Sequence, residues 1–294
     1  MILLLAASLL AAPAAGPAPA GISWQKTFDA AVAKAKANGV PIMVDFWAEW
    51  CRPCHMLDRD TYRDPTVVRL SRRFVSVKVN VEGSKEELDL ASRFLVDSLP
   101  TIAFLSPSGR QLWRINGYAS SEEFPPMIDE ALKIGARVIA WETALDKDPK
   151  DVAALRGLGL HQFAELQQTA RSNGSGLIPK FMLDDAGKLL GAAMEADKDE
   201  KAADRKRVRR VLGLVRGAEG NVAETEAMLK AALAIKPADA AEDADTHASL
   251  GELYIHQGKK ELAAKTFRKV AKEYPGTRGA TRAAQQLERL GARP

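Results

Sequence analysis

The residues best suited to chemistry are Cys51 and Cys54, the only cysteines in the chain. Arg52 and Pro53 separate them, and the largely hydrophobic segment 44–50 leads directly into them. Two cysteines cannot build a framework of stapling disulfides, but a local pair can cycle between dithiol and disulfide. If a helix begins at this point, its N-terminus stabilises a thiolate at Cys51, which becomes the attacking sulfur. Cys54, one turn further on, is then placed to resolve the mixed disulfide.

The elements around the cysteines follow from caps, turns and hydrophobic spacing. Pro53 suits the first turn of a helix, where a missing amide proton costs little. Apolar and β-branched runs predict strands at 42–47, 75–81, 101–105 and 111–115. Helical spacing predicts helices at 24–37, from 53, at 65–74, 84–96 and 121–138. This order predicts an α/β domain with a mixed central sheet covered by helices on both faces.

The second half of the chain has a different composition. All five tryptophans lie at or before Trp141, and the later residues are rich in Ala, Leu, Lys and Glu. Leu212, Gly220, Leu229 and Pro237 recur 38 positions later as Leu250, Gly258, Phe267 and Pro275. The unit 246–275 resembles the tetratricopeptide repeat pattern, the unit around Leu212 departs from it, and a looser third unit spans 158–193. We therefore expect an all-α repeat domain at 141–294, with residues 278–290 as a capping helix.

The segment from Val44 to Cys51 resembles the thioredoxin family at every position. The resemblance covers about residues 22–140 and implies a thioredoxin fold that needs no cofactor. It implies that Asp45 is a buried carboxylate beneath the second cysteine, paired with Lys78. It also implies that Leu99 and Pro100, with a cis bond, and Gly117 face the substrate together with Trp50.

An additional predicted helix at 61–70, with Asp64-Pro65, is similar to the periplasmic C-terminal domain of the membrane thiol-disulfide interchange protein. Arg52 stands where thioredoxin has glycine, and a cation there stabilises the thiolate and shifts the reduction potential toward more oxidising values. Arg52 and Pro53 are therefore the residues expected to tune the redox pair. We expect Asp45 to accept the proton of Cys54.

The chain begins with features of an export signal. Residues 1–20 contain an apolar stretch followed by small residues and prolines, which is typical of a signal peptide, although no Lys or Arg precedes the stretch. An uncleaved membrane anchor is the alternative. We expect a periplasmic or secreted protein. The net charge of +4, from 42 basic and 38 acidic residues, does not favour a nucleic-acid partner.

These observations predict an exported thiol-disulfide oxidoreductase that reduces protein disulfides through Cys51 and Cys54. Its helical repeats would recruit a protein client, and a membrane electron donor of the thiol-disulfide interchange type would supply its electrons. The alternative is a repeat-based interaction scaffold or assembly factor in which the redox domain is secondary. Cys51 to His55 also satisfies C-x-x-C-H, the haem c attachment motif. The remaining histidines have no metal-ligand spacing, so no metal site is predicted.

Overall fold

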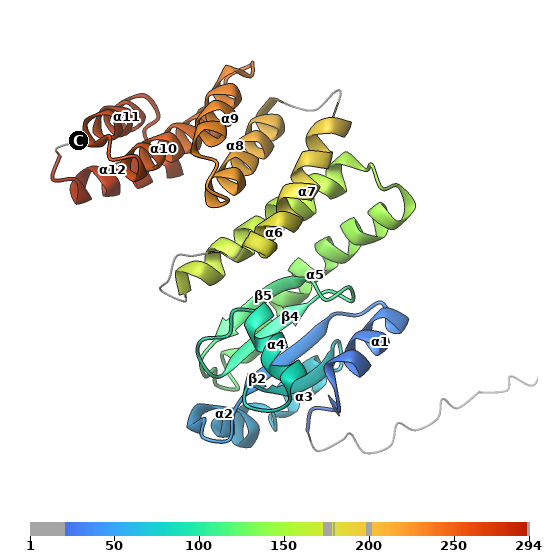
Figure 1. Cartoon of the computed structure of the whole chain (residues 1–294). Helices are drawn as coiled ribbons and strands as arrows, with labels where there is room; N and C mark the ends of the chain where they lie inside the picture. The colour runs from blue at the N-terminus through green and yellow to red at the C-terminus, as the bar shows by residue number, and fades with distance from the viewer. Residues whose placement is uncertain (1–20, 173–177, 179, 198–201, 293–294) are drawn as a thin grey trace, which may run out of the picture.

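The computed structural model describes residues 21–172, 178, 180–197 and 202–292. The predicted signal peptide, residues 1–20, lies outside the described residues. A five-stranded mixed sheet with flanking helices is followed by a helical region that extends away from one edge of the sheet (Figure 1). Within the described part of the chain, no helix is both long and apolar enough to span a membrane.

The sheet has the strand order β1-β3-β2-β4-β5. β3 is parallel to β1 and β2, whereas β4 is antiparallel to β2 and β5. The strands are β1 (Trp24–Gln25), β2 (Ile42–Trp47), β3 (Val75–Asn80), β4 (Thr101–Leu105) and β5 (Gln111–Asn116). The helices of this half are α1 (Phe28–Asn38), α2 (Arg52–Met56), the π-helix η1 (Leu57–Thr61), α3 (Pro65–Ser71), α4 (Lys85–Arg93) and α5 (Phe124–Lys147).

Alternation along the central strands divides the core into two layers. On β2, Ile42, Val44 and Phe46 pack with α1 and α4, whereas Met43 faces the layer formed by α3 and α5. Successive strand residues point to opposite faces, so Asp45 lies on the same face as Met43. The pattern of β2 therefore places the Asp45 carboxylate in the layer that contains Met43.

The first predicted helix is wrong at its start. Trp24 and Gln25 form the edge strand β1, parallel to β3, and α1 begins only at Phe28. The side chain of Thr27 accepts a hydrogen bond from the Ala30 amide, which caps the helix at this point. The Trp24 ring packs edge-on against Tyr62, with 5.3 Å between ring centroids.

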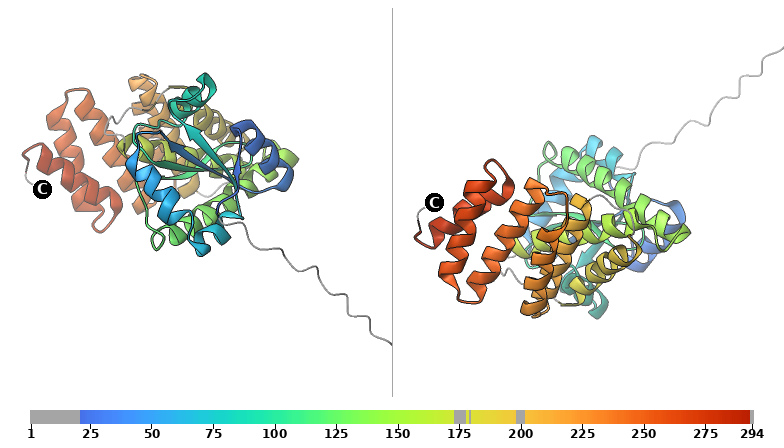
Figure 2. Two further views of the ribbon diagram at one scale, coloured as in Figure 1. Left: turned by 90° about the horizontal axis from the view of Figure 1, so that it is seen from below. Right: turned by 90° about the horizontal axis from the view of Figure 1, so that it is seen from above.

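The second half is helical, as predicted. Its helices are α6 (Val152–Ser172), α7 (Lys180–Ala196), α8 (Ala202–Ala218), α9 (Val222–Ala234), α10 (Ala240–His256), α11 (Lys260–Glu273) and α12 (Arg278–Arg289). Helices that follow one another in the chain run antiparallel and pack side by side. Figure 2 shows this stack from two further sides. This arrangement is consistent with the predicted repeats.

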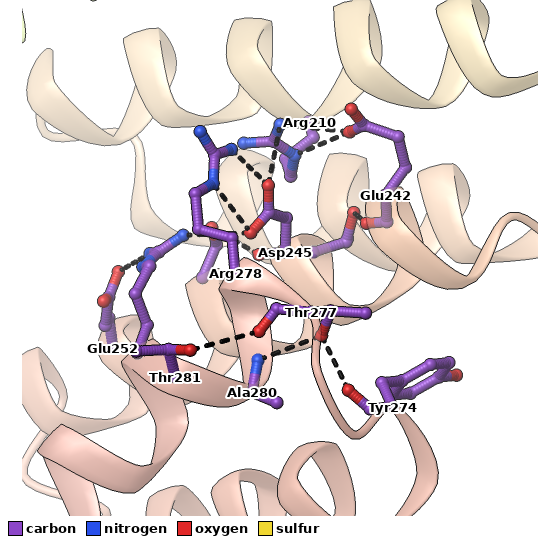
Figure 3. Close-up of polar contacts among 12 residues, drawn as sticks. Arg210, Glu242, Asp245, Glu252, Tyr274, Thr277, Arg278, Ala280 and Thr281 are labelled. Carbon is purple, nitrogen blue, oxygen red and sulfur yellow. Dashed lines mark hydrogen bonds and ion pairs between the residues drawn. The ribbon is translucent and has the colours of Figure 1, made fainter.

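A charged network joins three helices of this stack (Figure 3). Asp245 on α10 pairs with Arg210 of α8 and with Arg278 of α12. The carboxylate is buried, and arginines from both sides neutralise it. Arg210 also donates to Glu242 over 3.0 Å, so α10 is held from both neighbouring helices.

The two halves are joined by a continuous helix and by polar contacts. α5 runs unbroken through residue 140, the predicted boundary between the domains. Arg110, in the turn between β4 and β5, pairs with Glu142 of α5 and Asp185 of α7. Gln111 donates to Thr169 of α6 over 3.2 Å. The β5 edge of the sheet therefore supports the start of the helical stack.

Candidate active site

Cys51 and Cys54 lie where β2 leads into α2. Cys51 is the N-cap residue of α2, and its sulfur accepts a hydrogen bond from the Cys54 amide over 3.2 Å. The two sulfurs form a disulfide. Both cysteines are buried, with Cys51 2% exposed and Cys54 0% exposed. Pro53 occupies the first turn, as the sequence predicted.

Strand register places Asp45 beside Lys78. The two residues are direct partners in the parallel pair β2–β3, so their side chains share one face of the sheet. Lys78 Nζ lies 2.9 Å from Asp45 Oδ2, and Asp45 is 0% exposed. Burial raises the pKa of the Asp45 carboxyl above its ordinary value, although Lys78 opposes this shift. Asp45 is therefore a buried carboxyl that holds a proton more readily than an exposed one.

The Lys78 ammonium group lies in a pocket of acidic and aromatic side chains. Its second carboxylate partner is Asp58, with 2.7 Å between Nζ and Oδ1. The rings of Trp24, Trp47 and Tyr62 surround it with centroids 5.2–5.5 Å from Nζ. Burial alone would lower the pKa of Lys78, but the two carboxylates outweigh burial and raise it. Lys78 therefore stays charged and links buried Asp45 to partly exposed Asp58.

The predicted substrate-facing residues Leu99, Pro100 and Gly117 come from two loops that are joined by a hydrogen bond. Leu99 packs against the apolar cluster that contains Cys51 and Cys54. The Leu99–Pro100 bond is cis, as the sequence predicted. Gly117 has a φ of +90°, which glycine adopts without strain, and its amide donates to the Pro100 carbonyl over 2.7 Å. This hydrogen bond ties the two loops together.

Trp50, Arg52 and Pro53 are exposed beside the cysteines. Trp50 is 66% exposed, and its indole nitrogen donates to Glu82 Oε1 over 2.8 Å. The Arg52 side chain is also exposed. Their positions leave an apolar ring and a cation available to a protein that approaches Cys51.

Asp58, Tyr62 and Glu82 are site residues that the sequence analysis missed. Asp58 lies four residues after Cys54, so its helical spacing was a usable signal. The position of Tyr62 in the site depends on η1, in which the Tyr62 amide donates to the Leu57 carbonyl over 2.8 Å. Such a π-turn offsets all later residues by one position and has no clear sequence signature. Glu82 lies in the turn after β3, and only the fold brings it to Trp50.

The arrangement is suited to thiol-disulfide exchange. A cysteine at a helix start, a second cysteine one turn on and a buried carboxyl on the strand that leads to them are residue types that can act as a nucleophile, a resolving thiol and a proton acceptor. Among the described residues, no group of three or more His, Cys, Asp or Glu is placed to hold a metal ion.

Comparison with known proteins agrees with this geometry. Residues 23–107 match the model of the thioredoxin-like family, and this part of the chain forms a thioredoxin-like domain. Thiol:disulfide interchange protein DsbD from Campylobacter jejuni strain RM1221 is 30% identical over 95 residues, which are 32% of this chain and 17% of that protein. DsbD from Pectobacterium atrosepticum is 31% identical over 87 residues, 29% of this chain and 15% of the relative. The match thus spans less than a fifth of these relatives.

Two solved structures are also similar to part of the chain. A thioredoxin from Thermus thermophilus has a TM-score of 0.37 and 32% identity, and the match covers 39% of this chain and 90% of that chain. The oxidised C-terminal domain of Neisseria meningitidis DsbD has a TM-score of 0.33 and 18% identity, and the match covers 35% of this chain and 90% of that one.

Proposed function

We propose that this protein is a thiol-disulfide oxidoreductase that reduces disulfides in other proteins. The observation that carries the proposal is the Cys51–Cys54 disulfide at the start of α2, in the same domain as the buried Asp45–Lys78 pair. The thioredoxin-like match and the similarity to DsbD support this activity. No bound cofactor is needed, because the two sulfurs carry both electrons.

The reaction proceeds in two exchanges. In the dithiol form, the Cys51 thiolate attacks one sulfur of a substrate disulfide, and the other substrate sulfur leaves as a thiolate. A mixed disulfide then joins Cys51 to the substrate. Asp45 accepts the proton of Cys54, and the Cys54 thiolate attacks Cys51 Sγ. The substrate leaves as a dithiol, Cys51 and Cys54 are oxidised to the disulfide, and an external thiol donor restores the dithiol.

The helical stack supplies a second surface for a protein client. Holding a client beside Cys51 raises its effective concentration and selects which disulfide is attacked. We further propose that the protein acts outside the cytoplasm with a membrane electron donor of the thiol-disulfide interchange type. The apolar N-terminal segment and the similarity to DsbD support this location.

Trapping the mixed disulfide tests the proposal. In the full-length chain, Cys54→Ser leaves Cys51 able to attack but removes the resolving thiol, so a covalent client complex accumulates. Cys51→Ser is the matched control and should trap nothing. The dithiol form of the wild-type protein should reduce insulin disulfides, and both variants should fail to turn over. Trapping by neither variant, or turnover by Cys51→Ser, would contradict the proposal.

A further inference from the structure

Arg114 is a buried cation on β5 without a carboxylate partner. Its side chain is 5% exposed and lies opposite Ala103 on the face covered by α4. Within the described part of the chain, no ion pair involves Arg114. Burial lowers its pKa, although Asp97 and Glu165 act against the shift through space. The cost of burying this charge is therefore offset by hydrogen bonds to neutral groups.

These hydrogen bonds converge on the loops that flank the cysteines. Arg114 Nη1 donates to the Phe94 carbonyl over 2.8 Å, and Phe94 is the C-cap residue of α4. Nε donates to Asn116 Oδ1 over 2.9 Å, and Nη2 lies 3.4 Å from Thr101 Oγ1. A cation at a helix C-terminus also satisfies carbonyls that lack partners within the helix. One guanidinium thus joins the end of α4, the start of β4 and the end of β5.

The segment between these anchor points carries Leu99 and Pro100. It begins at Leu95, whose φ of +50° is unfavourable for a residue with a side chain. At its other end, the Thr101 hydroxyl donates to the Ser98 carbonyl over 2.8 Å. Leu99 contacts the cysteine cluster from this segment. A strained segment keeps one position only if its surroundings hold it, and Arg114 contacts both of its ends.

We propose that Arg114 is a positioning residue for the disulfide substrate, holding segment 95–100, and with it Leu99 and Pro100, in place beside Cys51. The inference rests on the proposed function, because it assigns Arg114 a role in that reaction. Arg114 itself touches neither sulfur in the structure. Its loss should therefore affect how a protein substrate is held rather than the chemistry of the cysteine pair.

The test compares how fast the full-length protein reduces a large and a small disulfide substrate. For Arg114→Met, the second-order rate constant for insulin reduction should fall about fivefold or more, because misplacing a binding loop weakens orientation. Reduction of 5,5′-dithiobis(2-nitrobenzoic acid), which needs little backbone contact, should stay within about twofold. The equilibrium constant of the cysteine pair with glutathione should be unchanged. Arg114→Lys keeps the charge but loses the planar fork of donors, and should lie between wild type and Arg114→Met.

Hydrogen exchange separates positioning from a general structural role. In Arg114→Met, the Gly117 amide and amides of residues 95–101 should exchange about tenfold faster, whereas amides of α10 should not change. Thr101→Val, which removes a link of the same network, should give the same pattern if Arg114→Met folds poorly. Arg110→Gln is the matched control, because Arg110 contacts α5 and α7 instead of these loops.

Two results would overturn the inference. The first is that Arg114→Met and Thr101→Val both reduce insulin at the wild-type rate and both exchange the amide hydrogens of residues 95–101 at the wild-type rate. The other is an equal loss on both disulfides with faster exchange throughout the chain, which would make Arg114 only a stabilising residue. If the wild-type protein reduces neither disulfide, the proposed function fails instead, and the exchange data alone decide whether Arg114 holds the segment.

Discussion

At the scale of single residues, Lys78 lies between two carboxylates with different access to water. Asp45 is fully buried, whereas the Asp58 side chain is 41% exposed. Lys78 therefore links the buried carboxyl of Asp45 to a carboxylate that reaches water. The aromatic rings around Lys78 keep its ammonium in contact with both acids.

Asp45→Asn should slow resolution of the mixed disulfide. Asparagine fills the same space but cannot accept the proton of Cys54, so release should slow roughly 10- to 100-fold at neutral pH. The rate is measured by stopped flow on a complex formed through Cys51. Asp60→Asn is the control, because Asp60 lies on η1 but pairs with exposed Arg59. An unchanged rate in Asp45→Asn would remove Asp45 from the mechanism.

Arg52→Gln should make the cysteine pair more reducing. An exposed cation beside the Cys51 thiolate stabilises it by no more than about 1 kcal/mol. Its loss should therefore lower the reduction potential by no more than roughly 20 mV. The shift is measured by equilibration with glutathione, with the exposed Arg69→Gln on α3 as the control. A shift toward more oxidising values in Arg52→Gln, or an equal shift in both variants, would contradict the assigned role of Arg52.

At the scale of elements, the sequence predicted the central strands well and the connections less well. The largely apolar run 42–47 and the Ser84 capping box were clear local signals, and β2 and α4 form there. β1 was missed because two residues at a sheet edge carry no periodicity. The end of α5 was also missed, because its last turns depend on contact with α6. The pairing of Asp45 with Lys78 could be predicted from the resemblance to the thioredoxin family. The contacts of Arg114 could not, because they depend on how the folded chain places the loops around it.

Close packing between α10 and α11 predicts opposite effects of two similar substitutions. A Cβ atom on Gly251 would lie 2.4 Å from the Phe267 ring, so Gly251→Ala should lower the free energy of unfolding by about 1–3 kcal/mol. Nothing lies within 4 Å of a Cβ on Gly191 in α7, so Gly191→Ala should raise it by about 0.5–1 kcal/mol. Denaturant unfolding followed by circular dichroism measures both. Equal effects would show that α10 and α11 are not packed in this way.

At the scale of the whole molecule, the contact between the two halves contains a carboxyl sensitive to pH. Glu165 of α6 is 8% exposed and lines a cavity of about 270 Å³ together with Leu95, Arg110 and Asp185. Burial raises its pKa from 4.5 to about 7. One turn earlier, burial lowers the pKa of His161 to about 4. Both groups are therefore uncharged in the folded protein at mildly acidic pH.

The folded protein should lose stability as the pH rises and Glu165 ionises, and Glu165→Gln should abolish this loss. Between about pH 4.5 and 7 the unfolded chain releases the Glu165 proton while the folded chain keeps it, so the free energy of unfolding falls by up to about 3 kcal/mol. Above pH 7 the loss is complete. The variant should match wild type near pH 4.5 and be the more stable protein at pH 8, as measured by urea unfolding. A constant difference across this range would contradict the shifted pKa.

The reduction potential of the Cys51/Cys54 pair tests the central claim most directly. It is measured by equilibrating the full-length protein with glutathione or dithiothreitol, alkylating free thiols and weighing the products by mass spectrometry. A reductant of protein disulfides should show one reversible two-electron transition between about −270 and −220 mV. A value above about −180 mV would indicate an oxidant or isomerase, and the absence of a reversible transition would leave the helical stack as the functional half.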